Sequence, residues 1–178
     1  MDPNSFTYYI GNASEGQVYG LELEYRREVF SNLQLSGNLG LLDSKTERYS
    51  FEVAPGQVVS LGDRAFAHAP NYSFRVGVNY NIASHISVRA SLAGKDEFYF
   101  SESHDQVSEA YHLVNFGITY AFSNSIEASF WVDNLLDTKY AVRGFYFGLE
   151  PPNYGEKLYM TYGDPRHFGL TLKYKFGL

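Results

Sequence analysis

Large apolar residues alternate with polar or small residues over long stretches of this chain. The clearest stretch covers residues 167–176, where every second side chain is large and apolar: Phe168, Leu170, Leu172, Tyr174 and Phe176. Because successive side chains of a strand point to opposite faces, this alternation predicts a strand with one apolar and one polar face. A stretch of about ten residues is also what a tilted strand needs to cross a lipid bilayer.

The same alternation recurs in six further segments, which are residues 19–26, 33–41, 72–82, 86–92, 114–122 and 126–133. With a short first strand over residues 6–10, the period-two pattern predicts about eight strands. No window shows the apolar stripe of an amphipathic helix. The expected fold class is therefore all-β, an antiparallel up-and-down meander.

The connections between these segments differ in length at the two ends of the expected sheet. One end has short turns rich in serine and asparagine, at residues 30–32, 83–85 and 123–125. The other end has one short turn, at residues 12–16, and long segments at residues 43–71, 95–110 and 136–166. Short periplasmic turns and long extracellular loops are typical of outer-membrane β-barrels, so the pattern predicts a transmembrane β-barrel segment.

Large aromatic residues stand near the strand ends on the apolar face. We expect them to form two belts at the membrane interfaces, where amphipathic rings are favoured. The belt at the short-turn end would contain Tyr25, Tyr80, Phe122 and Tyr174, and the opposite belt would contain Tyr72, Phe98 and Phe168.

The composition narrows the class of protein. Aromatic residues make up 17% of the chain, yet no apolar run is long enough for a membrane-spanning helix. A formal net charge of −6 and the lack of a basic stripe argue against nucleic-acid binding. The absence of cysteine excludes a disulfide framework and a thiolate metal site. The first residues lack the basic and apolar regions of a signal peptide, so we expect a mature segment or a piece of a larger protein.

Two segments in the C-terminal half carry a family resemblance. The sequence WVDNLLDTKY at residues 131–140 resembles the NL(F/T)D..Y segment of TonB-dependent outer-membrane receptors. The sequence YGDPRHFG at residues 162–169, with the alternating residues that follow, is similar to the closing loop exit and last strand of these receptors. RGFYF at residues 143–147 and GLELE at residues 20–24 are similar to a loop and a strand of the same family.

The resemblance implies that residues 1–178 are the C-terminal portion of a receptor barrel in the bacterial cell outer membrane. A complete family member folds an N-terminal plug inside a barrel of about 22 strands and engages the TonB energy-coupling protein. From the sequence we expect no plug domain, coupling box or signal peptide within residues 1–178. We therefore expect no transport by this chain alone, while its parent would import a scarce nutrient such as a ferric siderophore.

The resemblance also implies partners for the strands themselves. The apolar face would contact outer-membrane lipid. The barrel-assembly machinery would read the last strand as an assembly signal, through Phe168, Leu170, Leu172, Tyr174 and Phe176. Gly177 and Leu178 follow the terminal aromatic residue, and Leu178 keeps the apolar phase of the strand.

Two other architectures stay open at the level of sequence. An autonomous barrel closed by its own eight strands would be an adhesin or a structural protein, and its interior would have to be filled by side chains. Many inward-facing residues are small instead, such as Ser36, Gly77 and Gly117, and they suit an open segment of a larger barrel better. A soluble β-sandwich that binds ligand through its loops is the third architecture.

No residue set predicts catalysis, a cofactor or a metal site, so the chain is not expected to be an enzyme. The acidic loop 102–109 contains residues that can ligate metals, but their spacing matches no defined site and a solvated loop explains them better.

Ligand contacts are expected in the final long loop, from Arg143, Tyr146, Phe147 and Tyr154, with Lys157 and Tyr159 nearby. Rings and cations of this kind can hold an anionic or aromatic chelate by stacking and charge. The alternative is that the aromatic residues pack against neighbouring loops and order them.

Overall fold

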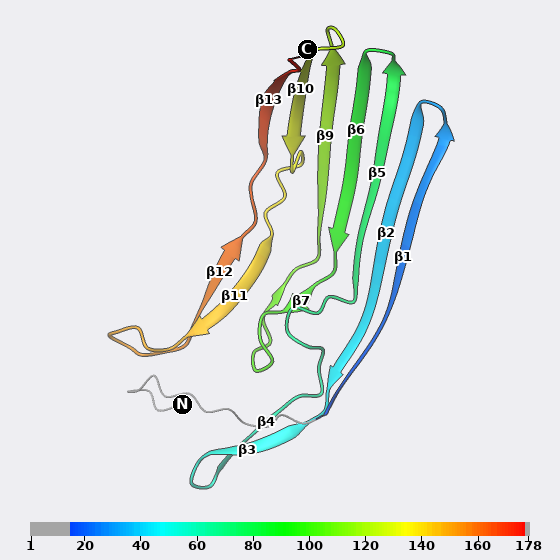
Figure 1. Cartoon of the computed structure of the whole chain (residues 1–178). Helices are drawn as coiled ribbons and strands as arrows, with labels where there is room; N and C mark the ends of the chain where they lie inside the picture. Colours follow the sequence, from blue (N-terminus) through cyan, green and yellow to red (C-terminus); the bar gives the residue numbers. More distant parts are fainter. Residues whose placement is uncertain (1–14, 177–178) are drawn as a thin grey trace.

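A single seven-stranded antiparallel sheet dominates the computed structural model, which describes residues 15–176 (Figure 1). The strands lie in the order β1, β2, β5, β6, β9, β10 and β13, so the sheet is a meander. Their bounds are Gly16–Phe30, Leu33–Thr46, Tyr72–Ala83, Ile86–Lys95, Tyr111–Ala121, Ile126–Asp133 and His167–Tyr174. The all-β antiparallel prediction is confirmed. The further strand expected over residues 6–10 lies outside the described residues.

The three long connections lie at one end of the sheet, and each folds into a small hairpin (Figure 1). The hairpins are β3 (Tyr49–Ala54) with β4 (Gln57–Leu61), β7 (Phe98–Tyr99) with β8 (Val107–Ser108), and β11 (Ala141–Phe147) with β12 (Lys157–Tyr162). Short turns join β1 to β2, β5 to β6 and β9 to β10 at the opposite end. The predicted difference between the two ends is confirmed. Within the described part of the chain, no helix is long and apolar enough to span a membrane.

The strand register places the apolar residues of neighbouring strands opposite one another, so that one face of the whole sheet is apolar. Leu39 of β2 lies opposite Leu23 of β1 and Phe74 of β5. At the other side of the sheet, Phe130 of β10 lies opposite Ile118 of β9 and Leu170 of β13. A register slip of one residue would turn each apolar set to the opposite face, so the alternation and the pairing specify each other.

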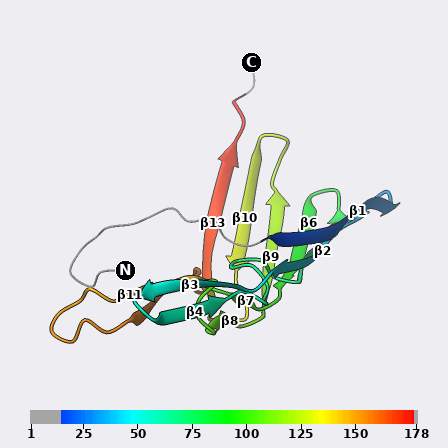
Figure 2. The same ribbon diagram turned by 90° about the horizontal axis from the view of Figure 1, so that it is seen from below.

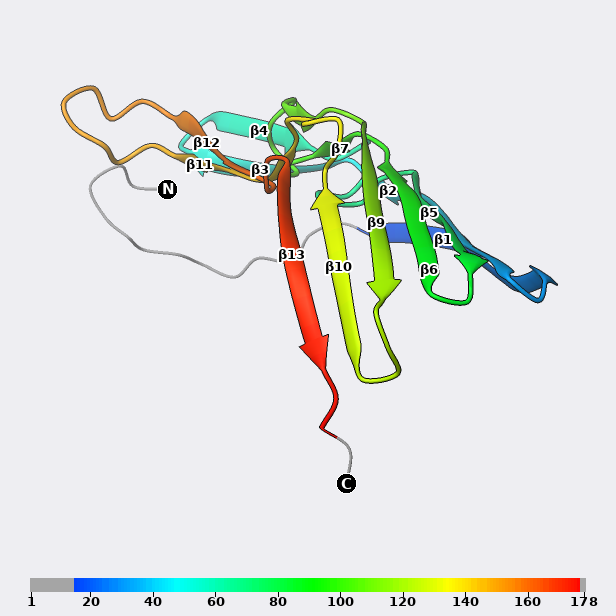
Figure 3. The same ribbon diagram turned by 90° about the horizontal axis from the view of Figure 1, so that it is seen from above.

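The sheet curves but does not close, as the views from below and above show (Figures 2 and 3). Among the described strands, β1 and β13 are each paired on one side only, and they are not paired with each other. An open edge leaves backbone N–H and C=O groups without partners, which a lipid environment does not tolerate. The seven described strands therefore do not close into a barrel, in contrast to the closed eight-stranded architecture that the sequence left open.

The belt prediction is wrong for Phe98. Its side chain is only 3% exposed and packs at ring-centroid distances of 5.3 Å from His68 and 5.9 Å from Phe100. The ammonium of Lys95 lies 4.8 Å from the centre of the same ring. Phe98 belongs to β7, so it lies beneath the loops and not on the outer face of the sheet. Five of the other belt residues lie on strands of the sheet, and Phe122 comes directly after the end of β9.

Candidate functional site

The four residues expected to contact ligand do not converge on one point. Arg143 and Phe147 share one face of β11, because the alternation from residue 143 to residue 147 is regular in its pairing with β12. Tyr146 points to the opposite face of the same strand. Tyr154 lies in the loop between β11 and β12, where its backbone has a positive φ of 49° and its side chain is exposed.

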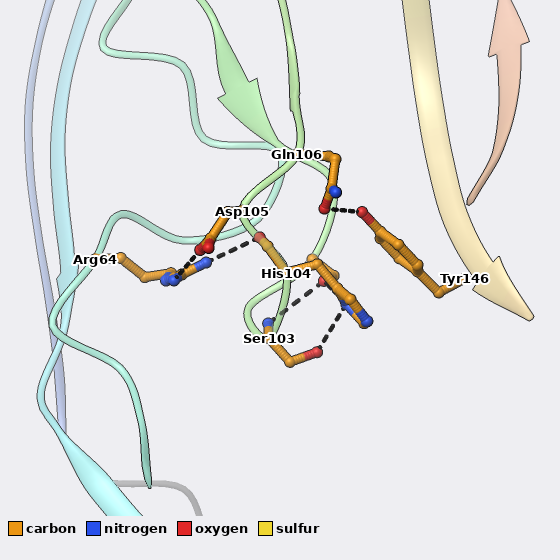
Figure 4. Close-up of polar contacts among 7 residues, drawn as sticks. Arg64, Ser103, His104, Asp105, Gln106 and Tyr146 are labelled. Atoms are coloured by element: carbon orange, nitrogen blue, oxygen red, sulfur yellow. Dashed lines mark hydrogen bonds and ion pairs between the residues drawn. The ribbon is translucent and has the colours of Figure 1, made fainter. Parts of the chain in front are cut away.

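Tyr146 joins a cluster of polar and aromatic side chains between two loops (Figure 4). Its ring stacks on the imidazole of His104, with ring centroids 3.4 Å apart and planes at 7°. Its hydroxyl donates a hydrogen bond to Gln106. Burial raises the pKa of the Tyr146 hydroxyl, and the nearby carboxylates of Glu156 and Asp105 raise it further. Tyr146 thus connects the β11–β12 hairpin to the loop between β7 and β8.

His104 is held from both sides of its ring. Its Nδ1 atom lies 2.7 Å from the Ser101 hydroxyl and 3.0 Å from the Ser103 hydroxyl. Its Nε2 atom lies 3.2 Å from a carboxylate oxygen of Glu156, which precedes β12. This arrangement supports the alternative given by the sequence, in which loop aromatic residues order their neighbours.

Arg64 connects a third loop to the cluster (Figure 4). Its guanidinium donates a hydrogen bond of 2.8 Å to the His104 carbonyl oxygen and lies 2.6 Å from the Asp105 carboxylate. The guanidinium also lies 4.9 Å from the centre of the Tyr99 ring. The three long connections therefore form one layer at this end of the sheet.

The tip of the β11–β12 hairpin is organised around Glu150. The carboxylate accepts hydrogen bonds of 2.6 Å from the Lys157 ammonium and 2.6 Å from the Tyr159 hydroxyl. The bond from Lys157, followed by that from Tyr159, holds the pKa of Glu150 below its usual range. Lys157 and Tyr159 are thus engaged within the hairpin.

The segment with the family resemblance forms a tight turn after β10, and Asn134 organises it. Asn134 is 4% exposed and adopts a positive φ of 50°. Its amide donates to the carbonyls of Thr138 at 2.9 Å and Asp164 at 3.1 Å, while its side-chain oxygen accepts from the Thr138 N–H at 2.9 Å. Asp137 accepts a 2.9 Å hydrogen bond from the Arg166 N–H just before β13. The resemblance located this segment, and the structure assigns it a structural role.

The inner face of the sheet contains a cavity of about 540 Å³ that the sequence did not predict. Arg75 of β5, Arg89 of β6 and Trp131 of β10 line it, together with Asp133. Two glycines make room for the large side chains: a Cβ on Gly117 would lie 2.7 Å from the Arg89 Nε, and a Cβ on Gly169 would lie 2.5 Å from the Trp131 ring. In both cases a large residue lies opposite a glycine on the neighbouring strand, and this pairing can be recognised only once the strand register is known.

The described part of the chain contains no cluster of side chains suited to bind a metal ion. No group of three or more histidine, cysteine, aspartate or glutamate side chains there is arranged to hold a metal ion. In the acidic loop 102–109, His104 and Asp105 are engaged by the contacts given above.

Comparisons with known proteins identify the fold. Residues 1–135 match the family model described as TonB dependent receptor-like, beta-barrel. The siderophore receptor PiuA from Acinetobacter baumannii is similar over 90% of this chain and 22% of its own, with a TM-score of 0.72 and 16% identity. The ferric yersiniabactin uptake receptor FyuA from Yersinia pestis is similar over 93% of this chain and 24% of its own, with a TM-score of 0.74 and 16% identity.

The copper transporter OprC is a third similar structure, with a TM-score of 0.62, 15% identity, and coverage of 90% of this chain and 24% of its own. The chain thus spans between a fifth and a quarter of the length of these proteins. At such low identity the solved structures establish the fold alone. Because the family model covers most of the sequence, the chain belongs to the TonB-dependent receptor β-barrel family.

Proposed function

We propose that this chain is the C-terminal part of a TonB-dependent receptor barrel in the bacterial outer membrane. The observation that carries the proposal is the open sheet with an exposed apolar face. Leu21 of β1 is 52% exposed and Leu170 of β13 is 82% exposed, and these strands are the two edges. Contact with lipid removes such side chains from water, and pairing with further barrel strands would satisfy both edges.

The proposed orientation follows from the two ends of the sheet. The short turns would face the periplasm and the layer of loops would face the outside of the cell. The last strand would also serve as the signal for the barrel-assembly machinery. Its apolar set is available for such a contact, because Phe168 and Leu172 of β13 are 71% and 74% exposed and Phe176, two residues after the strand ends, is 90% exposed.

The parent receptor would import a scarce nutrient, with a ferric siderophore as the first candidate. PiuA and FyuA are described as siderophore and ferric yersiniabactin receptors, whereas OprC is described as a copper transporter. Import would require a plug domain and the TonB energy-coupling protein, and this segment would supply part of the barrel wall. Its role is that of a transport component and not of an enzyme.

Ligand contacts at the outer end would come from the exposed side of the final loop. Arg143 and Phe147 lie on one face of β11, and Tyr154 lies at the hairpin tip. Among the ion pairs of residues 15–176, none involves Arg143. Tyr146 would contribute indirectly, by fixing the hairpin against His104.

Uptake of radiolabelled iron in cells that produce the parent receptor tests this function. We expect iron supplied as a panel of ferric siderophores to enter only when both the segment 1–178 and TonB are present. A receptor with Asn124→Ala, an exposed change in a short turn, is the matched control and should transport normally. Uptake that continues after removal of the segment would contradict the proposal.

A further inference from the structure

The cavity on the inner face of the sheet has the size and lining of a small-molecule site. Its volume of about 540 Å³ falls within the range of about 300–1,000 Å³ that ligand pockets occupy. The walls come from β5, β6, β9 and β10, with Ser36 of β2 and Thr171 of β13 completing the lining. These are neighbouring strands of one regular sheet, which hold side chains more rigidly than loops do.

The charge of the cavity is opposite to that of the chain. Arg75 and Arg89 both line it, although the chain as a whole has a formal net charge of −6. Neither guanidinium has a carboxylate as an ion-pair partner among residues 15–176. Asp133 is the only carboxylate in the described lining, and it lies 3.6 Å from the Nε2 atom of His167.

Both arginines are positioned by their neighbours. The Arg75 guanidinium donates a 3.1 Å hydrogen bond to the Ser91 hydroxyl. The Arg89 side chain lies over Gly117, where any larger residue would displace it. A guanidinium has five N–H donors in a planar fork, so donors remain for a carboxylate after such contacts.

Trp131 gives the cavity a flat apolar wall. Its indole lies over Gly169, and its Nε1–H donates a 3.2 Å hydrogen bond to the Thr171 hydroxyl. The His167 ring meets it edge-on at a centroid distance of 5.6 Å, which fixes the ring further. Fixed indole and guanidinium groups together favour a ligand that has both a flat ring and negative charge.

We propose that this cavity binds a small organic anion that carries carboxylates on or next to an aromatic ring. The inference rests on the proposed function in one respect: in a receptor barrel the inner face encloses the plug, so the cavity would lie between this wall and the plug, on the path of an imported nutrient. It extends that function by assigning a chemical class of ligand to Arg75, Arg89 and Trp131, which lie on the sheet and not in the loops.

The single tryptophan of the chain makes the test direct, because Trp131 lies in the wall of the cavity. Three probes are titrated into the full chain in detergent micelles while the Trp131 emission is recorded. Phthalate has a ring and two carboxylates, benzamide has a ring without charge, and inorganic phosphate has charge without a ring. We expect saturable binding of phthalate, with both other probes at least about 10-fold weaker.

Three variants assign the effect to the arginines. Arg75→Gln and Arg89→Gln should each weaken phthalate binding about 10-fold or more, because each removes a charge-assisted hydrogen bond. Arg89→Lys keeps the charge but loses the fork, and should restore only part of the affinity. Arg27→Gln is the matched control, since Arg27 shares the opposite face of the sheet with Leu35 and should bind like the parent chain. Equal circular dichroism spectra would show that the variants fold alike.

Several outcomes would overturn the inference. One is that phthalate changes the emission equally in Arg89→Gln and in the parent chain, and another is that benzamide and phosphate bind as tightly as phthalate. Absence of any saturable change would have the same meaning. These results do not depend on the uptake experiment. Phthalate binding without iron uptake would contradict the proposed function and support the anion site. Iron uptake without phthalate binding would support the proposed function and contradict the anion site.

Discussion

Replacing Asn134 tests how the end of β10 is held against β13. The Asn134→Ala variant removes three side-chain hydrogen bonds, two donated to the carbonyls of Thr138 and Asp164 and one accepted from Thr138. At about 1 kcal/mol each, their loss costs about 3 kcal/mol. Alanine at the positive φ of 50° adds about 1 kcal/mol, because a Cβ is strained in the left-handed region. The expected loss of stability is therefore about 4 kcal/mol.

Urea unfolding of the chain in detergent micelles measures this loss, with Trp131 as the fluorescent probe three residues away. Asn134→Gly loses the same bonds without the backbone strain, so its expected loss is about 3 kcal/mol. Asn124→Ala changes an exposed asparagine in the turn before β10, and should shift stability by no more than about 0.5 kcal/mol. A loss below about 1 kcal/mol for Asn134→Ala, or one no larger than that of Asn124→Ala, would refute the assigned role.

Three further predictions concern the loop layer and the two faces of the sheet. The pKa of the Glu150 carboxyl is lowered in the folded hairpin, so the carboxylate stabilises the hairpin above the ordinary carboxyl range, and this stabilisation is lost as the pH falls through the lowered pKa. Cleavage of the hairpin by an acid-active protease should therefore rise over that pH range, and it should stay constant in Glu150→Gln. Leu172→Lys places a charge on the apolar face at a cost of about 2–4 kcal/mol if it lies near the middle of the membrane, and should reduce the amount of assembled receptor in outer membranes. Thr171→Lys on the inner face is its control and should assemble normally; equal amounts of both variants would contradict the assignment of the faces. Gly169→Val should displace the Trp131 ring and shift its emission, and an unchanged spectrum would contradict the contact.

The strands were predictable because their signal is local and repeated. Along residues 167–176 each apolar residue is two positions from the next, and the register places Leu170 opposite Phe130 as one continuous apolar face requires. The loop layer was not predictable in the same way. Phe98 has the same character as the belt residues, and only the fold of β7 and β8 shows that it is buried.

The candidate sites show the same division. The side chains of Arg143 and Tyr146 point to opposite faces because side chains alternate along β11. Their directions could therefore be predicted once the segment was recognised as a strand. The partner of Tyr146 was not accessible, because His104 lies 42 positions away in another loop. The inner cavity depends on the pairing of Arg89 with Gly117 across two strands joined by a long connection. Sequence alone does not give that register.

Heat-modifiability on an SDS gel tests the central claim, that these strands are an open segment of a larger barrel. The chain is refolded from urea into detergent micelles, and boiled and unboiled samples are compared. The account predicts a β-rich spectrum with oligomers in the micelles and no compact monomer band that shifts on boiling, because β1 and β13 each keep an unpaired edge. A compact, SDS-resistant monomer that migrates differently after boiling would contradict it and show that these strands close on themselves.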